Sequence, residues 1–116
     1  MVLRLALAAL SVAAIAFGVV HLDASRACEA AQDDPARSVD ALLDRCEGAL
    51  PLATGSVALV EAGRLDDAAR LADAAAQRQP DDYVSWLAVA GVRAARGDRA
   101  GAQRARDRAE ELNPLR

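Results

Sequence analysis

The first 22 residues of the chain are almost entirely apolar, and the remainder alternates apolar and charged positions with a helical period. Between Val2 and Leu22 the only charged residue is Arg4. At about 1.5 Å per helical residue, the unbroken apolar run from Leu5 to Val20 crosses most of the hydrocarbon layer of a membrane. We therefore expect residues 1–22 to form a separate segment that inserts into a membrane.

Two interpretations of this segment remain open, a retained transmembrane anchor and a cleaved secretory signal peptide. The apolar run is longer than the usual signal core of about 7 to 15 residues, which favours the anchor. A signal peptide would be cleaved after a small residue such as Ala24 or Ala27. In both cases Arg4 favours a cytoplasmic N-terminus. The rest of the chain is then expected outside a cytoplasmic membrane of bacterial type, with a single pass if the anchor is retained.

The remaining sequence predicts helices and no strand, so the expected fold class is all-α. Strand-forming residues never alternate with polar residues over a useful length, whereas Ala, Leu, Arg, Glu and Gln all favour helices. Gly and Pro divide the sequence where helices end and begin. The expected helices run from Asp34 to near Gly48, from Pro51 to about Ala62, from Leu65 to just before Pro80, from Asp82 to Gly97, and from Arg99 to Leu112.

The last four of these helices form one unit that occurs twice. Four pairs of landmark residues, each occupying the same role in a helix–turn–helix unit, are 34 residues apart. The pairs are Gly63 and Gly97, Ala68 and Ala102, Ala75 and Ala109, and Pro80 and Pro114. The sequence therefore divides into residues 1–22, a linker and capping helix at 23–48, and two repeats at 49–82 and 83–116.

This unit resembles the tetratricopeptide repeat family, whose pattern combines a Trp and a Leu in the first helix, Ala in the second helix and a closing Pro. The second copy carries Trp86, Val89, Ala102, Ala109 and Pro114, and the first carries Leu52, Leu59, Ala68, Ala75 and Pro80. In departures from the pattern, Ala90 and Ser56 replace a glycine, and Arg93 and Arg106 replace aromatic residues. The resemblance implies a short helical solenoid, with residues 34–48 packing as an N-terminal half-repeat.

Cys28 and Cys46 both belong to the part expected outside the cytoplasm, where disulfides persist. A bridge between them would contribute roughly 3 kcal/mol in the chain-entropy account. The alternative is a buried free thiol, because Val39, Leu42, Leu43 and Cys46 form one apolar helical stripe.

The geometry of a bridge restricts the segment between the two cysteines. If Glu29 to Gln32 were helical and the chain turned tightly at Asp33, the two sulfurs would differ in height by roughly 10 Å. We therefore expect that a disulfide requires residues 29–34 to be extended.

No arrangement of residues predicts catalysis, a cofactor or a metal ion. The only histidine, His21, lies at the edge of the apolar segment, and the sequence has neither a C-x-x-C motif nor a Gly-rich phosphate loop. The pairs Asp66–Asp67 and Asp81–Asp82 lie at helix starts, where capping and the helix dipole explain them. We therefore expect a protein that is not an enzyme.

Charge divides the exported part into an acidic and a basic half. Residues 23–82 contain 13 acidic residues and six arginines, whereas residues 83–116 contain four acidic residues and seven arginines. The overall charge of −3 and the scarcity of aromatic residues argue against nucleic acid as a partner. The Arg-rich half is compatible with an acidic protein or with lipid head groups.

The family resemblance implies a protein-binding groove formed by the first helix of each repeat. That groove would be apolar, and it lacks the Lys and Asn side chains with which some family members hold a terminal carboxylate. The alternative is that these positions are buried inside the protein or by its own anchor. The corresponding residues are Leu50, Ala53, Val57, Val60, Glu61, Val84, Leu87, Gly91, Ala94 and Ala95.

These observations predict a membrane-anchored adaptor or accessory subunit of an envelope complex, whose partner is a membrane-associated protein. One alternative is a purely structural brace in a larger membrane complex. The other is a secreted repeat protein, released after signal cleavage.

Overall fold

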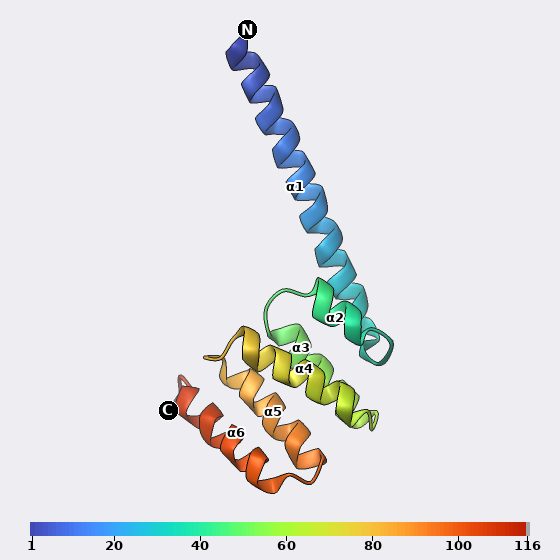
Figure 1. Ribbon diagram of the computed structural model, residues 1–116, viewed down its shortest axis with the longest axis vertical. Helices are drawn as coiled ribbons and strands as arrows, with labels where there is room; N and C mark the ends of the chain where they lie inside the picture. Colours follow the sequence, from blue (N-terminus) through green and yellow to red (C-terminus); the bar gives the residue numbers. More distant parts are fainter. Residues whose placement is uncertain (116) are drawn as a thin grey trace.

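The computed structural model describes residues 1–115, and over this range it contains helices and no strand. The prediction of an all-α chain is thereby confirmed. The molecule measures 68 × 34 × 18 Å, with α1 projecting from one end and α6 lying at the other (Figure 1). The helices are α1 (Val2–Asp33), the 3-10 helix η1 (Pro35–Arg37), α2 (Val39–Arg45), α3 (Leu50–Glu61), α4 (Leu65–Arg78), α5 (Tyr83–Ala95) and α6 (Arg99–Leu112).

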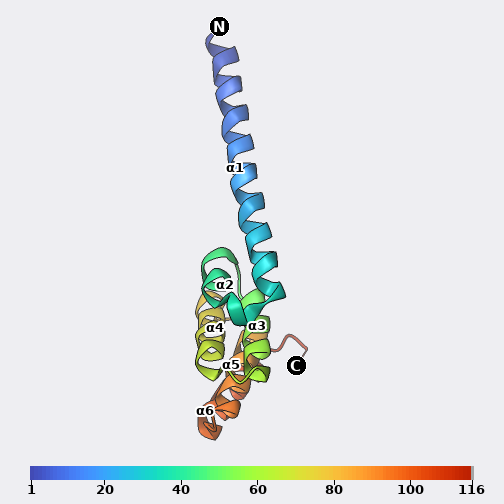
Figure 2. The same ribbon diagram turned by 90° about the vertical axis from the view of Figure 1, so that its right-hand side faces the viewer.

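Helix α1 is one continuous helix of 32 residues, and its apolar part is not buried by the rest of the protein. Its length is roughly 48 Å, which exceeds a hydrocarbon layer of about 30 Å. In Figure 2 the N-terminal part of α1 has no other segment beside it. The helix is thus long and apolar enough to serve as a membrane span or as a signal sequence.

Cys28 and Cys46 form a disulfide, and their Cα atoms are 4.8 Å apart. The free-thiol alternative is therefore not the arrangement in the structure. The expectation that residues 29–34 are extended was wrong, because α1 continues as a helix through Cys28 to Asp33.

The bridge is compatible with a helical α1 because the next α-helix starts later than the sequence suggested. Asp34 makes no capping hydrogen bond, and Pro35 opens only the 3-10 turn η1. Helix α2 begins at Val39 and Cys46 directly follows its last turn. Each cysteine consequently lies about two helical turns or less from the connection, so the two sulfurs reach the same height.

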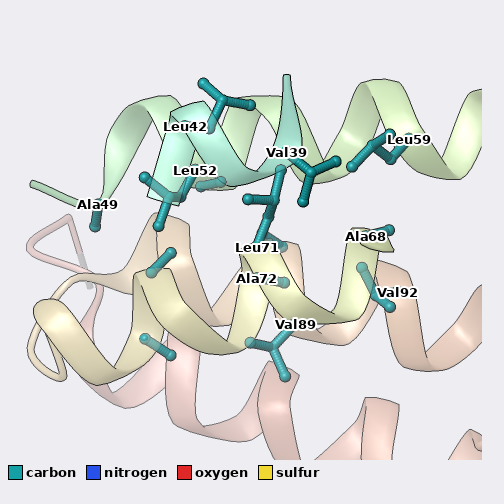
Figure 3. Close-up of a cluster of buried hydrophobic side chains, with 14 of the residues drawn as sticks. Val39, Leu42, Ala49, Leu52, Leu59, Ala68, Leu71, Ala72, Val89 and Val92 are labelled. Carbon is teal, nitrogen blue, oxygen red and sulfur yellow. The ribbon is translucent and has the colours of Figure 1, made fainter. Parts of the chain in front are cut away.

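The core is centred on α4, which packs against α2 and α3 on one side and against α5 on the other. Figure 3 shows Leu71 of α4 between Leu52 of α3 and Val89 of α5. Leu42 of α2 is also fully buried in this cluster. Because burying a leucine side chain contributes roughly 1.5 to 3 kcal/mol, these few leucines supply much of the stability of an alanine-rich domain.

Small residues make the contact between α5 and α6. Ala90 of α5 and Ala102, Ala105 and Ala109 of α6 are all buried. The half-buried Arg93, which replaces an expected aromatic residue, extends its aliphatic stem toward Gly101. The two helices therefore pack closely without a large aromatic side chain between them.

The two turns between paired helices use the same backbone geometry. Gly63 and Gly97 have φ angles of 74° and 83°, which L-residues with a side chain rarely adopt. The amide of Arg64 donates to the carbonyl of Leu59 at 2.8 Å, and the amide of Asp98 donates to the backbone carbonyl of Arg93 at 2.9 Å. Both helix stops were predicted from the glycines, and both are confirmed.

The acidic pairs at helix starts have different roles. Asp82 caps α5, because its carboxylate accepts hydrogen bonds from the amides of Val84 and Ser85 at 3.3 and 3.1 Å. The capping role predicted for Asp66 and Asp67 was wrong. They lie in the first turn of α4 without capping it, and they pair with arginine side chains instead.

Arg78, the last residue of α4, binds the C-terminal end of α2. Its Nη1 donates to the carbonyl of Cys46 at 2.6 Å, and its Nη2 donates to the carbonyl of Leu43. The last carbonyls of a helix have no partner within the helix. The Arg78 guanidinium therefore supplies partners for carbonyls at the end of α2 and joins α2 to α4. This link was not predicted from the sequence.

Replacing Arg78 by Ala should lower the free energy of unfolding by about 1 to 2 kcal/mol, because charge-assisted hydrogen bonds to carbonyls are lost. The matched control is Arg70→Ala on the same helix. Arg70 pairs with exposed Asp40 at 2.9 Å, and this hydrogen bond raises the pKa of its guanidinium. Exposed pairs of this kind contribute little. Chemical denaturation should separate the variants, and equal losses would contradict the role given to Arg78.

Ala75 of α4 is completely buried in the core. Ala75→Leu should destabilise the domain by about 1 to 3 kcal/mol, because the added volume forces neighbouring helices apart. Ala95→Leu, at the exposed end of α5, serves as the control. Thermal melts that fail to distinguish the two variants would show that α4 is not tightly packed at this position.

Candidate interaction groove

A hollow with a volume of 370 Å³ lies between α3 and α5. Its walls are apolar except for one threonine and one serine, and its floor contains several small residues. We call it the α3/α5 groove. It is lined by Ala53, Thr54, Ser56, Val57, Val60, Val84, Leu87, Ala88, Gly91 and Val92.

The structure brings six of the ten predicted groove residues together in this hollow, namely Ala53, Val57, Val60, Val84, Leu87 and Gly91. The other four, Leu50, Glu61, Ala94 and Ala95, are exposed near the ends of α3 and α5 and do not line it. The predicted set therefore extends further toward the ends of α3 and α5 than the hollow does.

Sequence reasoning missed four lining residues, Thr54, Ser56, Ala88 and Val92. Three of them, Ser56, Ala88 and Val92, are buried, so they lie at the base of the groove where the two helices approach. The small side chains of Ser56 and Ala88 were the signal available in the sequence, because small residues between adjacent helices leave space above them.

The groove remains open to solvent. Val57 and Leu87 keep 53% and 48% of their surface exposed. The apolar part of α1 does not cover them, since it is not buried against the rest of the protein. The alternative that these positions are buried by the protein itself therefore does not describe Val57 or Leu87.

The hydroxyl groups of the groove donate to their own helix. Thr54 Oγ1 donates to the carbonyl of Leu50 at 2.6 Å, and Ser56 Oγ donates to the carbonyl of Ala53 at 2.7 Å. A ligand in the groove therefore finds apolar surface and few free hydrogen-bond donors. Recognition by shape and apolar contact is the chemistry that such a surface supports.

Charged side chains are absent from the parts of α3 and α5 that form the groove. Helix α3 carries no charge before Glu61, and α5 carries none before Arg93. A partner that binds here need not remove water from any charged group of this surface. Charge depletion at the centre of the contact is also typical of protein interfaces.

A second hollow, of 270 Å³, lies where α1 meets the end of α2. Its lining includes His21, Glu29, Arg45 and Glu47, so it is polar and contains both signs of charge. Within residues 1–115, no three His, Cys, Asp or Glu side chains are grouped so that they could hold a metal ion.

The chain was compared with protein-family models, with curated proteins and with solved structures, and none of these comparisons found a match.

Proposed function

We propose that this protein is a membrane-anchored adaptor that holds a protein partner beside the membrane in the α3/α5 groove. The observation that carries the proposal is an open, uncharged, apolar groove in a domain attached to a long apolar helix. The partner would contribute an apolar segment, because the groove offers few free polar groups.

A repeat architecture of the tetratricopeptide type is part of this proposal. Two helix pairs, α3–α4 and α5–α6, end their first helices with the same hydrogen bonds at positions 34 residues apart. Helices α3 and α5 also contact each other, as the first helices of neighbouring repeats would. The charged outer residues of α6, such as Arg99 and Arg106, would keep the last repeat soluble.

A retained anchor is supported by the course of α1. The candidate cleavage residues Ala24 and Ala27 lie within the C-terminal third of this helix, whereas proteolysis favours exposed, irregular segments. Cys28 and Ala31, immediately after them, attach the same helix to the domain. A disulfide also suits an oxidising compartment, so we place the domain outside the cytoplasm.

The Arg-rich half is directed away from the membrane in this arrangement. Helix α6 lies at the end of the molecule opposite the N-terminus of α1 (Figure 1). Arg108 of α6 already binds Glu111, and Arg96 at the end of α5 already binds Asp66. This surface therefore faces away from the lipids that surround α1.

A photoreactive amino acid at Leu87 should form a discrete cross-link to a partner in native membranes, whereas one at Gln103 on α6 should not. Adding Val57→Glu should reduce the Leu87 cross-link at least about tenfold, because binding of the partner would then bury an unpaired carboxylate. Gln77→Glu, an exposed change on α4, is the matched control.

Equal cross-linking from Leu87 and Gln103 would contradict the groove assignment.

Purification in mild detergent distinguishes an adaptor from a structural brace. A partner lost at high salt or on dilution indicates an adaptor, whereas a stoichiometric complex that survives both treatments indicates a brace.

Replacing Ala13 by Arg should release the protein from membranes, because a charge near the centre of the span costs roughly 3 kcal/mol on insertion scales. Ala30→Arg adds the same charge to an exposed part of α1 outside the apolar run, and it should leave membrane retention unchanged. Membrane fractionation provides the measurement. A secreted product that begins after Ala24 or Ala27 in the parent protein would overturn the anchor.

A further inference from the structure

Helix α1 touches the domain only near its C-terminal end. Ala31, with 3% of its surface exposed, is the one buried residue of this helix, and Cys28 is partly buried against the core. On the N-terminal side of Cys28, the polar hollow separates α1 from Arg45 and Glu47. The two residues of α1 that pack in or against the core, Cys28 and Ala31, therefore lie within one helical turn.

This short contact has to fix the orientation of a long helix. The part of α1 that precedes Cys28 is roughly 40 Å long at the usual helical rise. A small rotation at Asp34, where the helix ends, would move the far end of α1 by many ångströms. Packing through one buried alanine is a weak restraint against such a rotation, since segments with few buried apolar contacts open readily.

Two bonds at Cys46 supply a stronger restraint. Its sulfur is bonded to Cys28 of α1, and its backbone carbonyl accepts a hydrogen bond from Arg78 of α4 at 2.6 Å. Arg78 also binds the carbonyl of Leu43, one turn earlier in α2. Cys46 thus links α1 to the central helix of the core by one covalent bond and one charge-assisted hydrogen bond.

We propose that Cys46, held by Cys28 on one side and by Arg78 on the other, locks the orientation of α1 relative to the helical domain. The lock holds the α3/α5 groove at a constant height and direction beside the membrane. It limits partners to proteins that present an apolar segment at that height. This inference rests on the retained anchor of the proposed function, although it does not depend on binding in the groove.

The test measures the distance between spin labels at residues 23 and 104 by pulsed electron resonance. The full chain is placed in phospholipid nanodiscs, and the labels are attached to azide-bearing amino acids so that both cysteines remain free to pair. Asp23 and Arg104 are exposed, on α1 and α6 respectively. Circular dichroism of each sample reports its helix content, and intact mass reports whether residue 23 is retained.

The parent protein should give one narrow distance distribution. The double variant Cys28→Ala with Cys46→Ala should broaden it by about 6 Å, because a 20° tilt at Asp34 moves residue 23, roughly 16 Å away, by that amount. Arg78→Ala should broaden it by a smaller amount with the disulfide intact. The control Arg70→Ala should leave it unchanged.

An unchanged width in the double cysteine variant, with its helix content preserved, would overturn the lock while leaving the anchor intact. Loss of helix content in that variant would also overturn it, since the bridge would then maintain the fold rather than the orientation. Loss of residue 23 by processing would refute the retained anchor, and this inference with it.

Discussion

The close approach of alanine-rich helices is the constraint on which the rest of this structure depends. Only 3% of the residues are aromatic, so few aromatic side chains are available to fill wide gaps between helices. Helix α4 meets its neighbours through Ala68, Ala72 and Ala75, and α6 meets α5 in the same way through Ala102 and Ala105. Such packing brings backbones together, but it buries little apolar area per residue, and the margin of stability is correspondingly small.

This constraint explains the importance of the disulfide and of Arg78 at the edge of the domain. The disulfide and the Arg78 hydrogen bonds hold α1 and α2, which contribute few large buried side chains, against the core. The same use of small residues produces the α3/α5 groove. Ser56, Ala88 and Gly91 leave space between the two helices, while Val57 and Leu87 stand above them at the surface. The alanine-rich core and the open apolar groove thus have one physical origin, the use of small residues between helices.

Local patterns in the sequence determined the helices and most of their boundaries. Gly63 and Gly97 predicted two turns because only glycine readily adopts their backbone angles, and Asp82 predicted a helix start because its side chain can cap free amides. The apolar run before Leu22 predicted a segment long enough to enter a membrane, and in the structure this run is helical and unburied. These features depend on residues within a turn or two of one another, which is why the sequence by itself was sufficient.

Contacts between distant residues were decided only by the tertiary structure. Asp34 and Pro35 have the local signature of a helix start, but they open only η1, which contacts α1 and α3, and α2 begins at Val39. Cys46 then follows α2 and lies beside Cys28. The pairing of Arg78 with α2 and the lining of the groove likewise depend on how helices cross. No pattern within one helix shows where its neighbour lies. The helices therefore followed from the sequence, whereas the bonds at Cys46 and the extent of the groove depended on the fold.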